Sequence, residues 1–241
     1  MNARNFTTAV SVLAMLASPA LAADSKVVVE LFTSQGCSSC PAADRVLGQL
    51  AAENKVIALS VPVDYWDYLG WRDTLAQPAH SNRQRGYSQT RGDREVYTPQ
   101  VVINGVAQAI GNDRSAIENA AKNLAAKDRM PVSVDVTRNG STVDVEIGAG
   151  TGAPAAVWLL AIAKVTPVSI GRGENHGKTV TYFNVVRSWQ RVAEWTGSPV
   201  KNSIPIADLN AKDTDAIAIL VQAGSVEKPG PIRGAAFLSL R

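Results

Sequence analysis

The chain has 241 residues, of which 46% are hydrophobic and 19% are charged, so its composition is that of a globular protein and excludes wholesale disorder. The 24 basic and 21 acidic residues leave a formal net charge of +3, which is not the basic surplus typical of nucleic-acid binding. We therefore expect neither a nucleic-acid partner nor a partner recognised mainly by charge.

The first 23 residues have the pattern of a secretory signal peptide. One positive charge at Arg4 precedes an apolar run from Ala9 to Ala17, and Ala20-Leu21-Ala22 fits the small-x-small rule for cleavage. The apolar run is too short to span a bilayer, and no second apolar segment of sufficient length follows. We expect cleavage near Ala22 or Ala23 and a periplasmic or secreted product without membrane insertion. A buried N-terminal helix is the alternative.

The N-terminal half alternates between buried strands and helices. Apolar runs at Val27–Phe32 and Val56–Val63 predict strands covered on both faces, and the helix of about three turns between them makes these strands parallel. A second helix is expected over Pro78–Gln89, and a two-strand hairpin over Gln100–Ala109. Asp113 then caps a third helix. The expected order is β-α-β-α-β-β-α.

After Met130-Pro131 the sequence changes to short alternating segments separated by Gly- and Pro-rich joints. Strands are predicted over residues 132–137, 142–147, 156–165, 178–188, 190–195, 216–222 and 232–240. We therefore expect an α/β domain at residues 24–130 and an all-β, sandwich-like domain at residues 131–241, after a signal peptide at residues 1–23.

Cys37 and Cys40 are the only cysteines, and their spacing is the main indication of function. They lie between the first predicted strand and a helix for which Pro41 suits the first turn. Because the free amides and the dipole of a helix N-terminus stabilise a thiolate, we expect Cys37 to be the nucleophile and Cys40 to resolve the mixed disulfide. A disulfide closing so short a loop would contribute only about 2 kcal/mol, which favours redox chemistry over stabilisation.

Two other interpretations of the pair stay open. The first is an inert local disulfide in a non-catalytic binding protein. The second is a metal site, but zinc needs at least three protein ligands, and the only histidines, His80 and His176, fall in different predicted domains. Haem attachment is excluded because Pro41 stands where the CxxCH motif has histidine. We expect no metal and no cofactor.

The predicted topology brings two further segments to the cysteines. Parallel strands end at the same edge of a sheet, so Asp64-Tyr65-Trp66 should lie near Cys37, and Thr98-Pro99 should begin the next strand there. The aromatic rings could hold a peptide or small thiol, or simply pack over the helices. Asp64 could relay protons to Cys40, or cap a helix or loop.

Cys37-Ser38-Ser39-Cys40 and Pro99 resemble the CxxC motif and the cis-proline of the thioredoxin superfamily. The resemblance implies a thioredoxin-like α/β fold, a cis peptide at Pro99, and main-chain pairing of an incoming substrate at Thr98. The chain is also similar to a bacterial family of secreted thioredoxin-like proteins of unknown function, through the stretches Glu30–Pro41, Val63–Trp71, Tyr97–Gln100 and Gly173–Lys178.

These observations together predict a periplasmic or secreted thiol–disulfide oxidoreductase. Its partner would be a thiol- or disulfide-bearing protein or small molecule, contacted by Thr98, Tyr65 and Trp66. The alternative is a non-catalytic binding or scaffold protein with a structural Cys37–Cys40 disulfide. The glycine-rich loop Gly171–Lys178 lacks the helix that a phosphate-binding loop requires. We expect this loop to dock against the first domain and shape the cleft.

Overall fold

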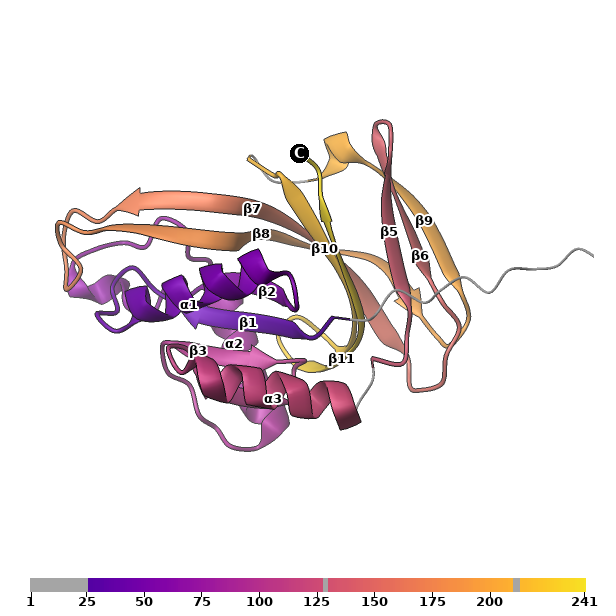
Figure 1. Cartoon of the computed structure of the whole chain (residues 1–241), viewed down its shortest axis with the longest axis horizontal. Coiled ribbons are helices and arrows are strands. Elements are labelled where there is room, and N and C mark those ends of the chain that lie inside the picture. Colours follow the sequence, from indigo (N-terminus) through magenta and orange to yellow (C-terminus); the bar gives the residue numbers. More distant parts are fainter. Residues whose placement is uncertain (1–25, 128–129, 210–212) are drawn as a thin grey trace, which may run out of the picture.

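The structure is a computed structural model that describes residues 26–127, 130–209 and 213–241; the predicted signal peptide lies outside these residues. Two sheets and three α-helices organise the described chain (Figure 1). In chain order the elements are β1 (Val28–Thr33), α1 (Cys40–Glu53), β2 (Ile57–Pro62), α2 (Pro78–Arg91), β3 (Gln100–Ile103), β4 (Ala107–Ile110), α3 (Arg114–Lys127), β5 (Val134–Asn139), β6 (Thr142–Ile147), β7 (Ala155–Ser169), β8 (Thr179–Trp195), β9 (Val200–Pro205), β10 (Ala216–Gly224) and β11 (Pro229–Ser239).

The larger sheet joins strands from both halves of the chain. Its eight strands lie in the order β11-β10-β7-β8-β2-β1-β3-β4, and β5, β6 and β9 form a separate three-stranded sheet. β1 and β2 are parallel, β3 is antiparallel to β1, and β8 joins the free side of β2 in parallel through the pair Ser60 and Val185. The large sheet is therefore mixed.

This sheet overturns the predicted fold class. We expected a thioredoxin-like α/β domain in the order β-α-β-α-β-β-α, followed by a separate all-β sandwich. The described chain is instead mostly β, with three α-helices and one mixed sheet that continues from β2 into β8, β7, β10 and β11. The prediction was wrong because hydrophobic periodicity predicts where strands lie but not which strands pair with each other. Pairing with β8 also covers an edge of β2 that would be free in a separate α/β domain. The domain boundary near residue 130 stays a prediction.

The hairpin of β7 and β8 is longer than the sequence suggested. Residues 178–188 and 190–195 were expected as two strands, but they form the single strand β8, which pairs with β7 along its length through two register shifts. Irregularities of this kind let a long ribbon twist without ending. In Figure 1 the hairpin runs alongside α1, and its tip lies at the end away from the three-stranded sheet.

Alternating side chains of β1 divide the core between its two faces. Val29 and Leu31 pack with α1 and α3, through residues such as Leu47 and Ile117. Val28 and Phe32 point to the other face, where Tyr87 of α2 joins their cluster. The three-stranded sheet closes a further core against β7 and β10, formed by residues that include Val145, Trp195 and Ile219. The cysteine-bearing loop thus follows a strand that is buried on both faces.

A buried ion pair connects α2 to the large sheet. Arg83 Nε lies 2.7 Å from Glu30 Oε1, and both side chains are fully buried. The guanidinium also donates to Tyr87 and to Gln222 of β10, and it lies over the ring of Trp189. Tyr87 donates in turn to Glu30. Side chains of β1, α2, β8 and β10 therefore meet in one polar cluster.

Candidate functional site

Cys37 and Cys40 form a disulfide in the connection between β1 and α1, with their Cα atoms 5.4 Å apart. Cys40 is the first residue of α1, and its amide donates to the Cys37 carbonyl oxygen at 3.2 Å. Cys37 is only 3% exposed and Cys40 is fully buried, whereas Ser38 and Ser39 are exposed. The pair therefore lies just beneath the surface at a helix N-terminus.

Thr98 and Pro99 lie beside Cys37, in the position expected from the topology. Cys37 Sγ is 3.8 Å from the Thr98 carbonyl oxygen and 3.4 Å from Ser39 Oγ. The Thr98–Pro99 peptide bond is cis, and it comes directly before β3. Because Phe32 pairs with Gln100 in the antiparallel register of β1 and β3, the residues that follow Phe32 and precede Gln100 are brought to the same sheet edge.

The aromatic side chains of the loop after β2 contact both the cysteine site and helix α2. Trp66 Nε1 donates to Thr98 Oγ1 at 2.7 Å, and a Cβ at Gly36 would lie 3.0 Å from Trp66 Cβ, so Trp66 packs closely on the cysteine loop. Tyr68 stacks on Trp66 and is 77% exposed. The Tyr65 hydroxyl donates to Gln84 of α2 and also lies near the Thr98 side chain, and burial raises the pKa of Tyr65 to about 12. Tyr68 is therefore the exposed ring of this loop, and Trp66, on which it stacks, connects it to Thr98 beside Cys37.

Asp64, the predicted proton relay, is held against α2. Its amide donates to Ser81 Oγ at 3.2 Å, and the Ser81 hydroxyl donates to Asp64 Oδ1 at 2.5 Å. This is the arrangement of a loop cap, and the relay to Cys40 stays a prediction. Within the described ranges, no group of three or more His, Cys, Asp or Glu residues could hold a metal ion.

Asp44 is a buried acid that our reading of the sequence missed. It follows Cys40 by four residues in α1, so the two side chains lie on one helix face. No hydrogen bond of good geometry reaches either carboxyl oxygen from the described residues, although the Thr33 hydroxyl lies nearby. Burial raises the pKa of Asp44 well above its usual value and the Asp73 carboxylate adds to the rise, while the Thr33 hydroxyl acts against it. An acid on the same face as Leu47 was the available signal.

Asp73 fixes the other side of the cysteine loop. Its carboxylate accepts hydrogen bonds from the amides of Gln35 at 2.8 Å, Leu75 at 2.8 Å and Ala76 at 3.0 Å. Burial nevertheless raises the pKa of Asp73, and those three amides act in the opposite direction. Asp44 and Asp73, both with raised pKa values, thus lie close enough for the Asp73 carboxylate to raise the pKa of Asp44.

The loop between β7 and β8 docks on the cysteines, as expected from the sequence. Asn175 is buried, and its Nδ2 donates to the carbonyl oxygens of Gln35 at 2.9 Å and Cys37 at 2.8 Å. Lys178 Nζ donates to Asn175 Oδ1, and Glu174 Oε2 accepts from the Ser38 amide at 3.2 Å. His176 is exposed on this loop. The second half of the chain therefore completes the site.

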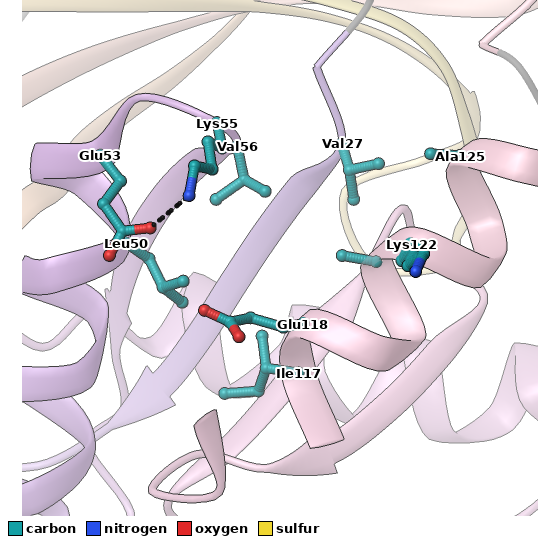
Figure 2. Close-up of a pocket in the computed structure, with 10 residues that line it drawn as sticks. Val27, Leu50, Glu53, Lys55, Val56, Ile117, Glu118, Lys122 and Ala125 are labelled. Atoms are coloured by element: carbon teal, nitrogen blue, oxygen red, sulfur yellow. Dashed lines mark hydrogen bonds and ion pairs between the residues drawn. The ribbon is translucent and has the colours of Figure 1, made fainter. Parts of the chain in front are cut away.

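A separate apolar hollow of about 320 Å³ lies between α1 and α3 (Figure 2). Leu50, Ile117 and Val27 contribute to its lining, and Glu53 pairs with Lys55 at its rim at 3.2 Å. Leu50 and Glu53 belong to the last turn of α1, which places the hollow about 20 Å along the helix from Cys40. It is therefore not part of the disulfide site.

Residues 28–222 match the family described as "Protein of unknown function (DUF1223)". The chain belongs to this family. It is also similar to the crystal structure of Protein AGR_C_4864 from Agrobacterium tumefaciens, with 34% sequence identity, a TM-score of 0.81, and coverage of 91% of this chain and 96% of that chain. A comparison with curated proteins found no match. The matched range of the family contains both the cysteine pair and the loop that docks on it.

No helix within residues 26–127, 130–209 and 213–241 is long and apolar enough to cross a membrane.

Proposed function

We propose that this protein is a thiol–disulfide oxidoreductase of the periplasm or the cell exterior that acts on protein or small thiols. The observation that carries the proposal is the placement of the Cys37–Cys40 disulfide at the N-terminus of α1, with Cys37 Sγ beside the Thr98 carbonyl. A bridge across so short a loop adds little stability, whereas a helix N-terminus favours a thiolate.

In the proposed reaction the cysteine pair accepts two electrons from a dithiol. A substrate thiolate attacks Cys37 Sγ, the Cys37–Cys40 bond breaks, and Cys40 leaves as a thiolate that takes up a proton. The second substrate thiolate then attacks the substrate sulfur of the mixed disulfide. This step releases an oxidised substrate disulfide and the Cys37 thiolate. The same steps in reverse reduce a substrate disulfide.

Asp44 suits the proton transfer at Cys40 in this scheme. It lies one helical turn beyond Cys40, and its raised pKa brings its proton exchange closer to neutral pH than that of an ordinary carboxyl. We propose that Asp44 gives its proton to the departing Cys40 thiolate and takes a proton back in the reverse step. Trp66 and Tyr68 would provide the ring surface that a bound substrate covers.

One observation favours the alternative, a binding or scaffold protein with a structural disulfide. Both cysteines are buried, and an incoming thiolate needs access to a sulfur atom. In the redox proposal, the contacts that cover Cys37 must open when a substrate binds. The two functions therefore predict different reduction potentials for the same pair.

The deciding measurement is the reduction potential of the purified protein in graded thiol buffers, read by alkylation and mass. A value between roughly −120 and −270 mV supports exchange, whereas a value below about −300 mV indicates a structural bridge and overturns the proposal. Cys40→Ser should in addition trap a mixed disulfide with the natural partner. The matched Cys37→Ser variant should trap none.

A further inference from the structure

We propose that Glu174, at the tip of the β7–β8 hairpin, biases the Cys37–Cys40 pair toward its disulfide form by placing a carboxylate where a Cys37 thiolate needs hydrogen-bond donors. The inference rests on the proposed redox function and deepens it. It makes Glu174 a positioning residue of the redox site, supplied by the half of the chain that carries no cysteine.

Few main-chain amides near Cys37 are free to donate a hydrogen bond to its sulfur. The Ser38 amide, directly after Cys37, donates to Glu174 Oε2 at 3.2 Å. The Cys40 amide donates to the Cys37 carbonyl oxygen, and Pro41 has no N–H. Three positions around the start of this helix thus offer no free amide to a sulfur anion, and Glu174 is responsible for one of them; the Ser39 hydroxyl, 3.4 Å from Cys37 Sγ, remains as a donor. Removing the charge of Glu174 would weaken its hydrogen bond to the Ser38 amide and leave that amide more available to a Cys37 thiolate.

The main chain that carries the exposed Glu174 side chain is held against the cysteine loop by its neighbours. Asn175 is buried and bonds the carbonyl oxygens of Gln35 and Cys37, so the main chain beside Glu174 is attached to the cysteine loop. On the other side, Gly173 has a positive φ, and a Cβ there would lie 3.4 Å from Trp71 Cβ. The tip therefore cannot move away from Cys37 without breaking buried hydrogen bonds.

The charge of the Glu174 carboxylate affects the reduced form of the cysteine pair and not the disulfide. With glutathione as the reductant, one protein disulfide and two glutathione thiols give two protein cysteines and one glutathione disulfide. The oxidised pair carries no charge, but the reduced pair carries negative charge whenever Cys37 is a thiolate. A carboxylate bound to the next residue's amide repels that thiolate. The equilibrium therefore shifts toward the disulfide.

Glu174→Gln tests this directly, because the amide oxygen of glutamine can still accept from Ser38 while the charge is lost. We expect the equilibrium constant for reduction by glutathione to rise about three- to tenfold, where tenfold corresponds to about 30 mV. In 1 M salt, where the Debye length is about 3 Å, the difference from the unaltered protein should shrink. Glu174→Asp, which keeps the charge, should stay closer to the unaltered protein.

Glu146→Gln is the matched control, since Glu146 is an exposed glutamate of the three-stranded sheet and the variant has the same change in net charge. It should leave the equilibrium constant unchanged. A second readout uses Cys40→Ser, in which Cys37 is a free thiol. Adding Glu174→Gln to that variant should move the pH midpoint of Cys37 alkylation downward.

The outcomes separate this inference from the proposed function. If the unaltered pair equilibrates with glutathione but Glu174→Gln matches it at low salt, the role of Glu174 is overturned and the redox function stands. If the unaltered pair resists reduction across the buffers used for exchange catalysts, the redox function itself fails. An equal rise in Glu174→Gln and Glu146→Gln would also overturn the inference, because net charge alone would then explain the effect.

Discussion

Asn175 Nδ2 lies 2.8 Å from the carbonyl oxygen of Cys37, although the two residues are 138 positions apart in the sequence. The same amide group bonds the Gln35 carbonyl, so one side chain from the β7–β8 tip holds the main chain on both sides of Gly36. The geometry of the cysteine loop is thus set by both halves of the chain.

Asn175→Ala should destabilise the protein by about 1–3 kcal/mol, because it leaves two carbonyl oxygens without their buried donor. Denaturant unfolding measures the loss, and hydrogen exchange should show faster opening at residues 34–40. Asn202→Ala is the control, since it removes one part-buried bond to Val192 in another region. Equal exchange at residues 34–40 in both variants would contradict the role of Asn175.

Asp44→Asn should make the protein more stable at neutral pH and slower in thiol exchange. Burial raises the pKa of Asp44, so the folded state binds this proton more tightly than the unfolded chain. The contribution of protonated Asp44 to folding stability is fully present below about pH 3.8 and is lost as the pH rises through the raised pKa. The variant should therefore gain roughly 1–3 kcal/mol over the unaltered protein at pH 7, and the gap should close in acid.

Asp113→Asn should change stability at neutral pH in the opposite direction from Asp44→Asn, and it serves as the comparison. Asp113 accepts from the Ala116 amide at 3.0 Å and from the Ser115 hydroxyl, and these bonds lower its pKa. Its contribution is therefore present at neutral pH and is lost as the pH falls below about 3.8. Urea unfolding from pH 3 to pH 8 measures both profiles. Parallel profiles for the two variants would refute the assignment of Asp44.

His80 should make the fold sensitive to mild acid. Burial lowers its pKa to about 4 and the nearby Arg83 and Arg187 act in the same direction, whereas the bond to the Pro62 carbonyl and Asp64 oppose the shift. A depressed histidine pKa means that stability is fully present above about pH 6.5 and is lost as the pH falls toward 4. The expected loss is about 3 kcal/mol.

His80→Asn should flatten that profile, because asparagine retains a donor for Pro62 and does not titrate in this range. The exposed His176→Asn is the matched control and should follow the unaltered protein between pH 4 and 6.5. If His80→Asn keeps the same slope in denaturant titrations, another group is responsible for the acid sensitivity.

Arg83→Met should be among the most damaging single substitutions, at about 3–5 kcal/mol, since it leaves the buried Glu30 carboxylate without its cation. Adding Glu30→Gln should recover part of the loss, because the unpaired charge is then removed. A double-mutant cycle from thermal unfolding checks this coupling. Arg114→Met removes a partly exposed arginine with two glutamate partners and should change stability far less. A strictly additive cycle would contradict the coupling.

Local pattern in the sequence was enough to locate the elements around the cysteines. The apolar run before Cys37 is strand β1, and the polar segment after Pro78 is helix α2. The placement of Thr98 beside Cys37 also followed from the order of these elements. Such features depend on periodicity, on turn residues and on where parallel strands end, and all three are determined by residues close together in the sequence.

The tertiary structure decided which strands became neighbours and which groups became buried. Pairing of β8 with β2 replaced the expected separate sandwich with one eight-stranded sheet, and the same hairpin carries Glu174 and Asn175 to the cysteines. The burial of Asp44 likewise depends on the elements that cover α1. The sequence by itself determined the cysteine spacing and the local elements, whereas contacts between residues more than a hundred positions apart depend on packing and hydrogen bonds that no local pattern contains.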